Sequence, residues 1–185
     1  MKKIHINDKI LSRLGGLVLN RFKPTYKIDK VASIPFVLLE RDNIKGIMFD
    51  VDNTLTTMGK GITEENEKWL KEAKKLGYNI CLVSNTINFK KVRKIMNDLE
   101  VNGLYFARKP GTKGLNKALK LMELKKEEVM LVGDQVFTDI WGANKFGIKS
   151  ILVNPISKKE GPFTIIKRPL EKLVLKLAEK EKTND

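Results

Sequence analysis

The chain has 185 residues, of which 42% are hydrophobic and 31% are charged, a composition typical of one globular domain. The 36 Lys and Arg residues outnumber the 22 Asp and Glu residues, and the formal net charge is +14. A balance this basic favours anionic partners such as nucleic acid, anionic lipid surfaces or phosphorylated substrates. The single cysteine, Cys81, excludes an internal disulfide and a zinc site built from cysteines.

Residues 1–43 form a basic N-terminal segment that we separate from the remaining residues, 44–185. Ile10, Leu14 and Leu17 recur there at helical spacing among lysines and arginines. The pattern predicts an amphipathic helix that either lies on a membrane surface or packs on the domain. We find no apolar run of the ~20 residues that span a bilayer and no signal-peptide pattern. We therefore expect a cytoplasmic protein, with peripheral contact to the inner face of an anionic membrane as an option.

The first half of the domain alternates strand and helix patterns. Ile44 to Phe49 predicts a buried strand that ends in a polar turn. Thr63 is placed to cap a helix through about Leu76. Asn79 to Val83 predicts a second strand, and Lys90 to Leu99 predicts a helix. The basic residues of that helix indicate a solvated face or, alternatively, an electrostatic funnel for an anion.

The second half continues the alternation. It predicts three more strands, at Leu104 to Ala107, Val129 to Val132 and Ile148 to Val153. Helices are expected from Thr112 and from Thr138 or Asp139. Strands that alternate with helices favour parallel pairing, which predicts a doubly wound α/β sheet of about five strands. A last helix over residues 170–180 carries a leucine-rich face that we expect to pack against the sheet.

Polar side chains follow these predicted strands: Asp50, Asp52, Ser84, Lys109 and Asp134. The carboxyl ends of parallel strands meet at one edge of a sheet, where ligands bind. Gathered carboxylates repel one another unless a cation lies between them, and Mg²⁺ prefers such ligands together with phosphate oxygens. A lysine and a serine suit the remaining phosphoryl oxygens. The pattern therefore predicts a site for phosphoryl transfer.

The order and spacing of these motifs resemble the phosphatases of the haloacid dehalogenase (HAD) superfamily. Asp50-Val51-Asp52-Asn53-Thr54-Leu55 is similar to the first motif, Ser84-Asn85-Thr86 to the second, Lys109-Pro110 to the third, and Gly133-Asp134-Gln135 with Thr138-Asp139 to the fourth. The resemblance covers about residues 44–153. It extends to the subfamily IIIA, YqeG-like branch, which is related to phosphatidylglycerophosphate phosphatases.

The resemblance implies a catalytic role for each matching residue. Asp50 attacks phosphorus and forms an aspartyl-phosphate, and Asp52 protonates the leaving oxygen before it activates water. Ser84 and Asn85 bind the transferring phosphoryl group. Lys109 stabilises the charge of that group and of the nucleophile.

The resemblance also implies a Mg²⁺ site. Asp134 holds the ion together with Asp50 and the backbone carbonyl of Asp52. Asp139 supports the metal shell or orients Lys109.

The gaps between the motifs leave no room for a large cap domain. We therefore expect an open HAD-like Rossmannoid domain, suited to a phosphate on a bulky or membrane-surface carrier such as phosphatidylglycerophosphate. A soluble sugar or nucleotide phosphate is the alternative substrate. A basic module that binds RNA or membrane without catalysis is the alternative function, although we do not expect nucleic acid as a partner. A phospho-accepting receiver domain fits less well, because Asp134 comes after Lys109.

Overall fold

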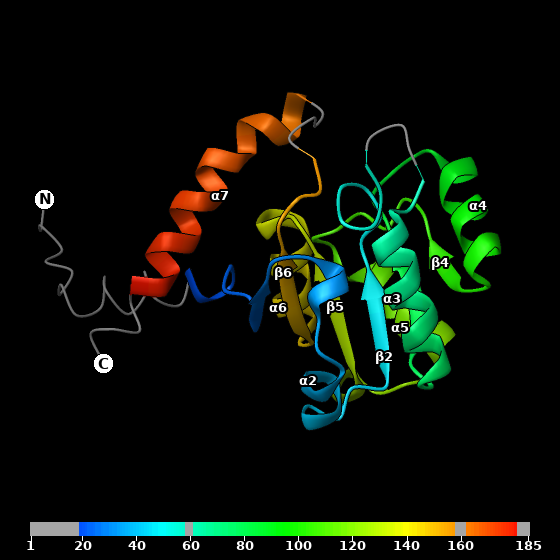
Figure 1. Cartoon of the computed structure of the whole chain (residues 1–185). Coiled ribbons are helices and arrows are strands. Elements are labelled where there is room, and N and C mark those ends of the chain that lie inside the picture. Colours follow the sequence, from blue (N-terminus) through cyan, green and yellow to red (C-terminus); the bar gives the residue numbers. More distant parts are fainter. Residues whose placement is uncertain (1–18, 58–60, 158–161, 181–185) are drawn as a thin grey trace, which may run out of the picture.

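The computed structural model describes residues 19–57, 61–157 and 162–180 (Figure 1). Its centre is one parallel sheet of six strands: β1 (Tyr26–Ile28), β2 (Gly46–Phe49), β3 (Asn79–Val83), β4 (Asn102–Leu104), β5 (Val129–Gly133) and β6 (Lys149–Val153). The strand order is β1-β6-β5-β2-β3-β4. This confirms the predicted doubly wound α/β fold, with one strand more than expected.

The central strands are apolar throughout because both of their faces are covered. Every residue of β2 is buried, and Met48 pairs with Cys81 on one side and Leu131 on the other. Phe49, the last residue of β2, lies in register with Leu82 and Val132. The residues that follow these three strands consequently meet at one edge, which we call the carboxyl edge.

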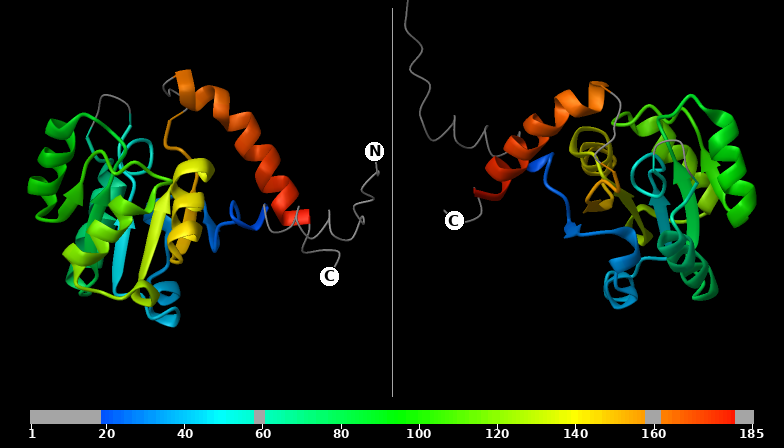
Figure 2. Two further views of the ribbon diagram at one scale, coloured as in Figure 1. Left: turned by 180° about the vertical axis from the view of Figure 1, so that it is seen from behind. Right: turned by 45° about the horizontal axis from the view of Figure 1, so that its top comes forward.

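Helices cover both faces of the sheet. α3 (Glu64–Lys75) and α4 (Phe89–Leu99) bury Trp69, Leu70 and Val92 on one face. On the other face, α5 (Thr112–Met122) and α6 (Trp141–Phe146) bury Leu115 and Ala143 (Figure 2). The remaining elements are α2 (Phe36–Arg41), α7 (Pro162–Lys180), the 3-10 turns η1 (Val31–Ser33) and η2 (Lys126–Glu128), and the π-helix η3 (Val136–Ile140).

Several predicted helix boundaries are confirmed. The Thr63 side chain accepts a hydrogen bond from the Asn66 amide and caps α3, which ends one residue before Leu76. α4 begins one residue earlier than predicted, at Phe89, and α5 begins at Thr112 as expected. The segment around Thr138 and Asp139 begins instead as η3, which continues into α6.

Two strand predictions were incomplete or wrong. β1 was missed because three residues carry too little pattern to identify a strand. The strand expected at Leu104 to Ala107 lies earlier, at β4, and the chain then turns with Phe106 at φ 55°. The glycine in β4 is required by packing, since a Cβ on Gly103 would lie 2.9 Å from the Cβ of Leu82.

The last helix does not pack as predicted. The side chains of Leu170, Leu173 and Leu177 are exposed, and α7 extends past the β6 side of the sheet (Figure 1). The helix is attached instead by Glu171 and Ala178, which are buried. The leucine face was expected to cover the sheet, but polar contacts to η3 decide the orientation of α7.

The predicted N-terminal amphipathic helix lies mostly in residues 1–18, outside the described residues. Beyond them, β1 pairs with β6 and therefore belongs to the same sheet as the phosphatase motifs. Among residues 19–57, 61–157 and 162–180, no helix has the length and apolar character needed to cross a membrane.

Candidate active site

The candidate site lies at the carboxyl edge, where the sheet register brings the predicted motifs together. Asp50 directly follows β2, and its amide donates to the carbonyl of Val132 at 2.9 Å. Ser84 directly follows β3, and Asp134 directly follows β5. All three are buried. Burial of polar groups at the end of three apolar strands carries a cost that their mutual contacts must offset.

Lys109 is the buried cation at the centre of the site. Its Nζ lies 2.7 Å from Asp50 Oδ1 and 2.7 Å from Asp139 Oδ1. Burial lowers the pKa of Lys109, but the carboxylates of Asp139 and Asp50 more than reverse this effect and raise the pKa above its ordinary value. Lys109 therefore carries its positive charge at neutral pH.

Two of the buried carboxylates, Asp50 and Asp134, resist ionisation. Burial raises the pKa of Asp50 to about 7, Lys109 opposes the shift, and Asp139 and Asp134 add to it. Burial, together with Asp139, raises the pKa of Asp134 to about 6, although Arg168 opposes the rise. A cation that binds among these groups would favour their charged forms.

Three carboxylates offer oxygens to such a cation. Asp50, Asp134 and Asp139 each place one oxygen within 4.8 Å of the others. The second oxygen of Asp50, Oδ2, is buried and has no hydrogen-bond partner in the described part of the chain. Oxygen donors of this kind fit a hard cation such as Mg²⁺.

Asp52 lies apart from this cluster. Its side chain is about half exposed, and Oδ1 is 2.6 Å from the Nζ of Lys91 on α4. Lys91 also donates to Thr56 Oγ1 at 2.8 Å. The sequence indicated only a solvated or funnel-like face for this helix. The sequence offered one indication that Lys91 reaches back over the carboxyl edge, because α4 begins soon after the second motif.

Ser84 and Asn85 hold the loops at this edge. The Thr86 amide donates to Ser84 Oγ at 3.1 Å. The Asn85 side chain donates to the Lys109 carbonyl at 2.9 Å and accepts from the Lys109 amide at 2.7 Å. Both polar groups of Asn85 therefore fix the backbone of Lys109, and the predicted contacts of Ser84 and Asn85 with phosphate stay predictions.

Asp139 is held against the end of β5 by close packing. A Cβ on Gly133 would lie 2.3 Å from the Cγ of Asp139, so glycine is required for this approach. The Gln135 amide donates to Asp139 Oδ2 at 3.0 Å, which leaves Oδ1 facing Lys109. The π-helix η3 thus carries Asp139 into the site.

Sequence reasoning missed two residues of α7 that contact the site. Arg168 forms an ion pair with the carboxylate of Asp134, and its Nη1 donates to the Asp134 carbonyl at 2.6 Å. Glu171 pairs with Arg168 at 3.2 Å and accepts from the Phe137 amide at 3.0 Å. An arginine and a glutamate one turn apart on α7 were the only signal in the sequence.

Solved structures share this fold. An uncharacterized protein from Listeria monocytogenes serotype 4b is 18% identical, with a TM-score of 0.53 over 72% of this chain and 99% of that chain. The 3-deoxy-D-manno-octulosonate 8-phosphate phosphatase from Yersinia pestis is 12% identical, with a TM-score of 0.50 over 77% of this chain and 86% of that chain. Identities this low establish similarity of fold alone. This fold and the carboxylate–lysine edge, together with the family match described next, define a HAD-type phosphatase, a phosphoric monoester hydrolase.

Sequence comparison narrows this class. The family model described as "Mitochondrial PGP phosphatase" matches residues 17–157, and the chain belongs to this family. A Bacillus subtilis (strain 168) protein described as "Probable phosphatase YqeG" is 36% identical over 83% of this chain and 90% of its own length. The "Phosphatidylglycerophosphate phosphatase 1, chloroplastic/mitochondrial" of Arabidopsis thaliana is 27% identical over 91% of this chain, which spans about half (52%) of that relative.

Proposed function

We propose that the protein is a Mg²⁺-dependent phosphatase that hydrolyses phosphatidylglycerophosphate through an aspartyl-phosphate on Asp50. The observation that carries the proposal is the buried Oδ2 of Asp50, which has no hydrogen-bond partner among the described residues, in a carboxylate that pairs with Lys109 through Oδ1 and clusters with Asp134. An oxygen with no hydrogen bond keeps its lone pairs available, either to coordinate a metal ion or to attack a phosphorus atom. The description of the matching family and the name of one relative indicate the substrate class.

The first half of the reaction transfers the phosphoryl group. A carboxylate oxygen of Asp50 forms a bond to phosphorus while the bond between phosphorus and the leaving oxygen breaks. Asp52 gives its proton to the leaving oxygen, so the product departs as a neutral alcohol. Lys109 neutralises charge on the phosphoryl oxygens, and Ser84 donates a hydrogen bond to one of them.

The second half regenerates the enzyme. Asp52, now a carboxylate, takes a proton from water as the water oxygen attacks phosphorus. The bond between phosphorus and Asp50 breaks, and inorganic phosphate is released. Asp50, Asp134 and the backbone carbonyl of Asp52 would hold Mg²⁺, which supplies positive charge to the phosphoryl oxygens when bound. Asp139 keeps Lys109 aimed at Asp50.

The resting contact of Asp52 with Lys91 has a consequence for this mechanism. Oδ1 of Asp52 is held by Lys91 at 2.6 Å, whereas the first step needs the Asp52 side chain turned toward the leaving oxygen. We propose that phosphate oxygens of the substrate draw Lys91 away and so release Asp52. Lys91 would then belong to substrate binding as well as to the positioning of Asp52.

A phosphate-release assay tests the proposal. Phosphatidylglycerophosphate in detergent micelles is compared with a soluble sugar phosphate and a nucleoside monophosphate, with Mg²⁺ and with excess chelator. We expect turnover of the lipid to exceed that of the soluble substrates and to stop in chelator until Mg²⁺ is restored. Equal rates on all three would refute the lipid substrate, and undiminished hydrolysis in chelator would refute the metal site.

A matched pair of variants distinguishes loss of the nucleophile from loss of a surface carboxylate. Asp50→Asn removes the proposed nucleophile, whereas Asp98→Asn removes an exposed carboxylate on α4. Only the first substitution should stop phosphate release. Loss of activity in both would point to a general effect of charge on the fold.

A further inference from the structure

Large apolar side chains are exposed beside the candidate active site. Ile87, Phe89, Tyr105 and Phe106 are between 43% and 79% exposed. Phe and Ile side chains on loops are costly to leave in water unless a partner covers them. The exposure of these four side chains therefore indicates a partner that covers them.

Ile87 lies in the loop after β3 and Phe89 begins α4 at the end of that loop, whereas Tyr105 and Phe106 lie in the loop after β4. The Phe106 amide donates to the Thr86 carbonyl at 3.1 Å, and the Ala107 amide donates to the Ser84 carbonyl at 2.8 Å. The rings of Phe89 and Tyr105 lie 6.1 Å apart. The two loops thus form one continuous surface, which begins within three residues of Ser84 and of Lys109.

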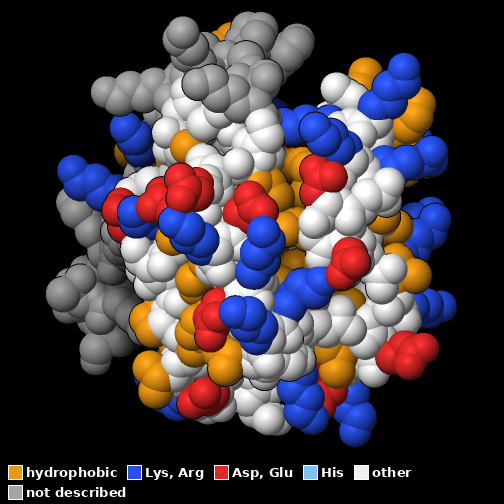
Figure 3. Space-filling model, turned by 45° about the vertical axis from the view of Figure 1, so that its right-hand side comes forward, with side chains coloured by type: hydrophobic (Ala, Val, Ile, Leu, Met, Phe, Trp, Pro, Cys, Tyr) orange, Lys and Arg blue, Asp and Glu red, His pale blue; other side chains and the backbone are white. Residues whose placement is uncertain are grey.

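The two segments that form this surface carry charge of one sign. Residues 85–94 and 105–113 contain seven lysines and arginines and no acidic residue. Five of these cations are exposed: Lys90, Arg93, Lys94, Arg108 and Lys113. None of the five has an ion pair with an acid within the described ranges. Figure 3 shows lysine and arginine side chains mixed with apolar ones over the α4 side of the molecule.

Two of the cations lie directly on the exposed rings. The Arg108 guanidinium is 4.5 Å from the Phe106 ring centre, and the Arg93 guanidinium is 5.8 Å from that of Phe89. Such pairs keep a charged group next to apolar surface, an arrangement suited to the boundary between lipid headgroups and acyl chains. We call the four apolar residues and the five exposed cations the rim patch.

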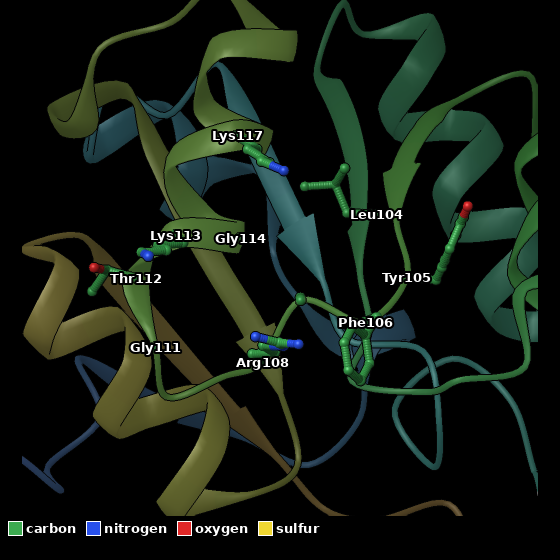
Figure 4. Close-up of a pocket in the computed structure, with 10 residues that line it drawn as sticks. Leu104, Tyr105, Phe106, Arg108, Gly111, Thr112, Lys113, Gly114 and Lys117 are labelled. Atoms are coloured by element: carbon green, nitrogen blue, oxygen red, sulfur yellow. The ribbon is translucent and has the colours of Figure 1, made fainter.

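The rim patch continues into a groove of about 540 Å³ between β4 and α5. Leu104 and Phe106 line it on one side, and Lys117 points across it toward Leu104 (Figure 4). Arg108 lies at the end nearer Gly111. The groove therefore combines apolar walls with cations at both ends, the same chemistry as the rim patch.

We propose that the rim patch docks the protein on the surface of an anionic lipid bilayer. The partner is a bilayer because the patch pairs apolar and aromatic tips with unpaired cations and offers no acidic group to a protein surface of mixed charge. Docking in this way faces Asp50 and Lys109 toward the headgroups. The inference rests on the proposed function and specifies the surface by which that site reaches a lipid phosphate.

Vesicle sedimentation of the full chain tests the inference. Vesicles of phosphatidylcholine are compared with vesicles that also contain phosphatidylglycerol, at low and high salt. We expect binding to the anionic vesicles only, with release as salt rises, and about fivefold weaker binding for each exposed cation of the patch changed to glutamine. Equal binding to both kinds of vesicle, or none, overturns the proposal.

Variants that lose exposed apolar side chains locate the docking face. Ile87→Ser combined with Phe106→Ser should weaken binding to anionic vesicles at least tenfold. The control is Val37→Ser combined with Leu76→Ser, which removes two exposed apolar residues (69% and 53% exposed) at the opposite edge of the sheet. Wild-type binding by the rim variant, or equal losses in both variants, overturns the proposal.

A spectroscopic test reports insertion directly. The fluorescence that Phe106→Trp adds to that of Trp69 and Trp141 should be quenched by vesicles that contain brominated phosphatidylcholine and phosphatidylglycerol, whereas the fluorescence added by Val37→Trp should not. Absence of quenching at position 106 in vesicle-bound protein would assign docking to another surface. These measurements need no turnover, so failure of the proposed phosphatidylglycerophosphate activity would leave their outcome unaffected.

Discussion

Gly133→Ala should damage the candidate site without removing any polar group. A Cβ at position 133 would lie 2.3 Å from the Cγ and 2.4 Å from the Oδ2 of Asp139, closer than real Cβ atoms approach other heavy atoms. The backbone of β5 must shift, or Asp139 must leave its place. Asp139 faces Lys109 on one side and the Gln135 amide on the other, so either movement disturbs both contacts.

The cost follows from these contacts. Overpacking a buried position costs about 1–3 kcal/mol. Losing a hydrogen bond to a charged group, here between the Gln135 amide and Asp139, costs about 1.5–3 kcal/mol. We expect the free energy of unfolding to fall by about 3–5 kcal/mol. Displacement of Lys109 by an ångström should lower kcat about 10²-fold.

Urea denaturation and phosphate release measure the two effects. Gly61→Ala is the control, because a Cβ at Gly61 meets no atom of the described residues within 4 Å. The free energy of unfolding of Gly61→Ala should lie within about 0.5 kcal/mol of that of the wild type. If Gly133→Ala matched this control in both stability and kcat, Asp139 would not be held by its packing against β5, and its role in aiming Lys109 would be refuted.

Three further predictions concern the carboxylates of the candidate site. Asp50→Asn should abolish phosphate release and leave the circular dichroism spectrum unchanged, and release at the wild-type rate would refute the nucleophile. Asp52→Asn should lower kcat by about 10²–10⁴-fold through loss of proton transfer, which steady-state kinetics would show. Burial raises the pKa of Asp50 to about 7 and of Asp134 to about 6, whereas both ionise near 4 when unfolded. The folded state therefore holds more protons between about pH 4 and 7, and thermal melts in chelator should show stability falling as pH rises through that window. A melting temperature that rises from pH 5 to 7 would contradict this.

The residues that meet at the carboxyl edge could be predicted because they depend only on which residues follow each strand in the chain. Apolar runs mark β2, β3 and β5, and parallel pairing brings their carboxyl ends together whatever the details of the helices. Asp50, Ser84 and Asp134 therefore meet as expected from the sequence. Lys109 reaches the same edge even though β4 was placed wrongly, because Asn85 fixes the Lys109 backbone through both polar groups of its side chain.

The contacts made by helices were less predictable. Lys91 reaches Asp52, and Arg168 reaches Asp134, because of how α4 and α7 are rotated and placed over the sheet edge. A helical period shows which residues share a face and does not show what that face meets. The leucines of α7 illustrate this, since a pattern expected in a core is exposed while Arg168 and Glu171 make the contacts.

The contact between α7 and Asp134 joins the candidate active site to a helix outside the sheet. Asp134 is buried, and Arg168 pairs with both its carboxylate and its carbonyl. The Arg168 guanidinium and a metal ion would each neutralise negative charge on the same carboxylate, so metal binding at Asp134 would weaken the Arg168 contact. Glu171 provides Arg168 with a second acid on its own helix and keeps it near η3 when Asp134 is shared. The attachment of α7 and the electrostatics of the candidate site are therefore coupled through one carboxylate, although no substrate contact of α7 is needed for that coupling.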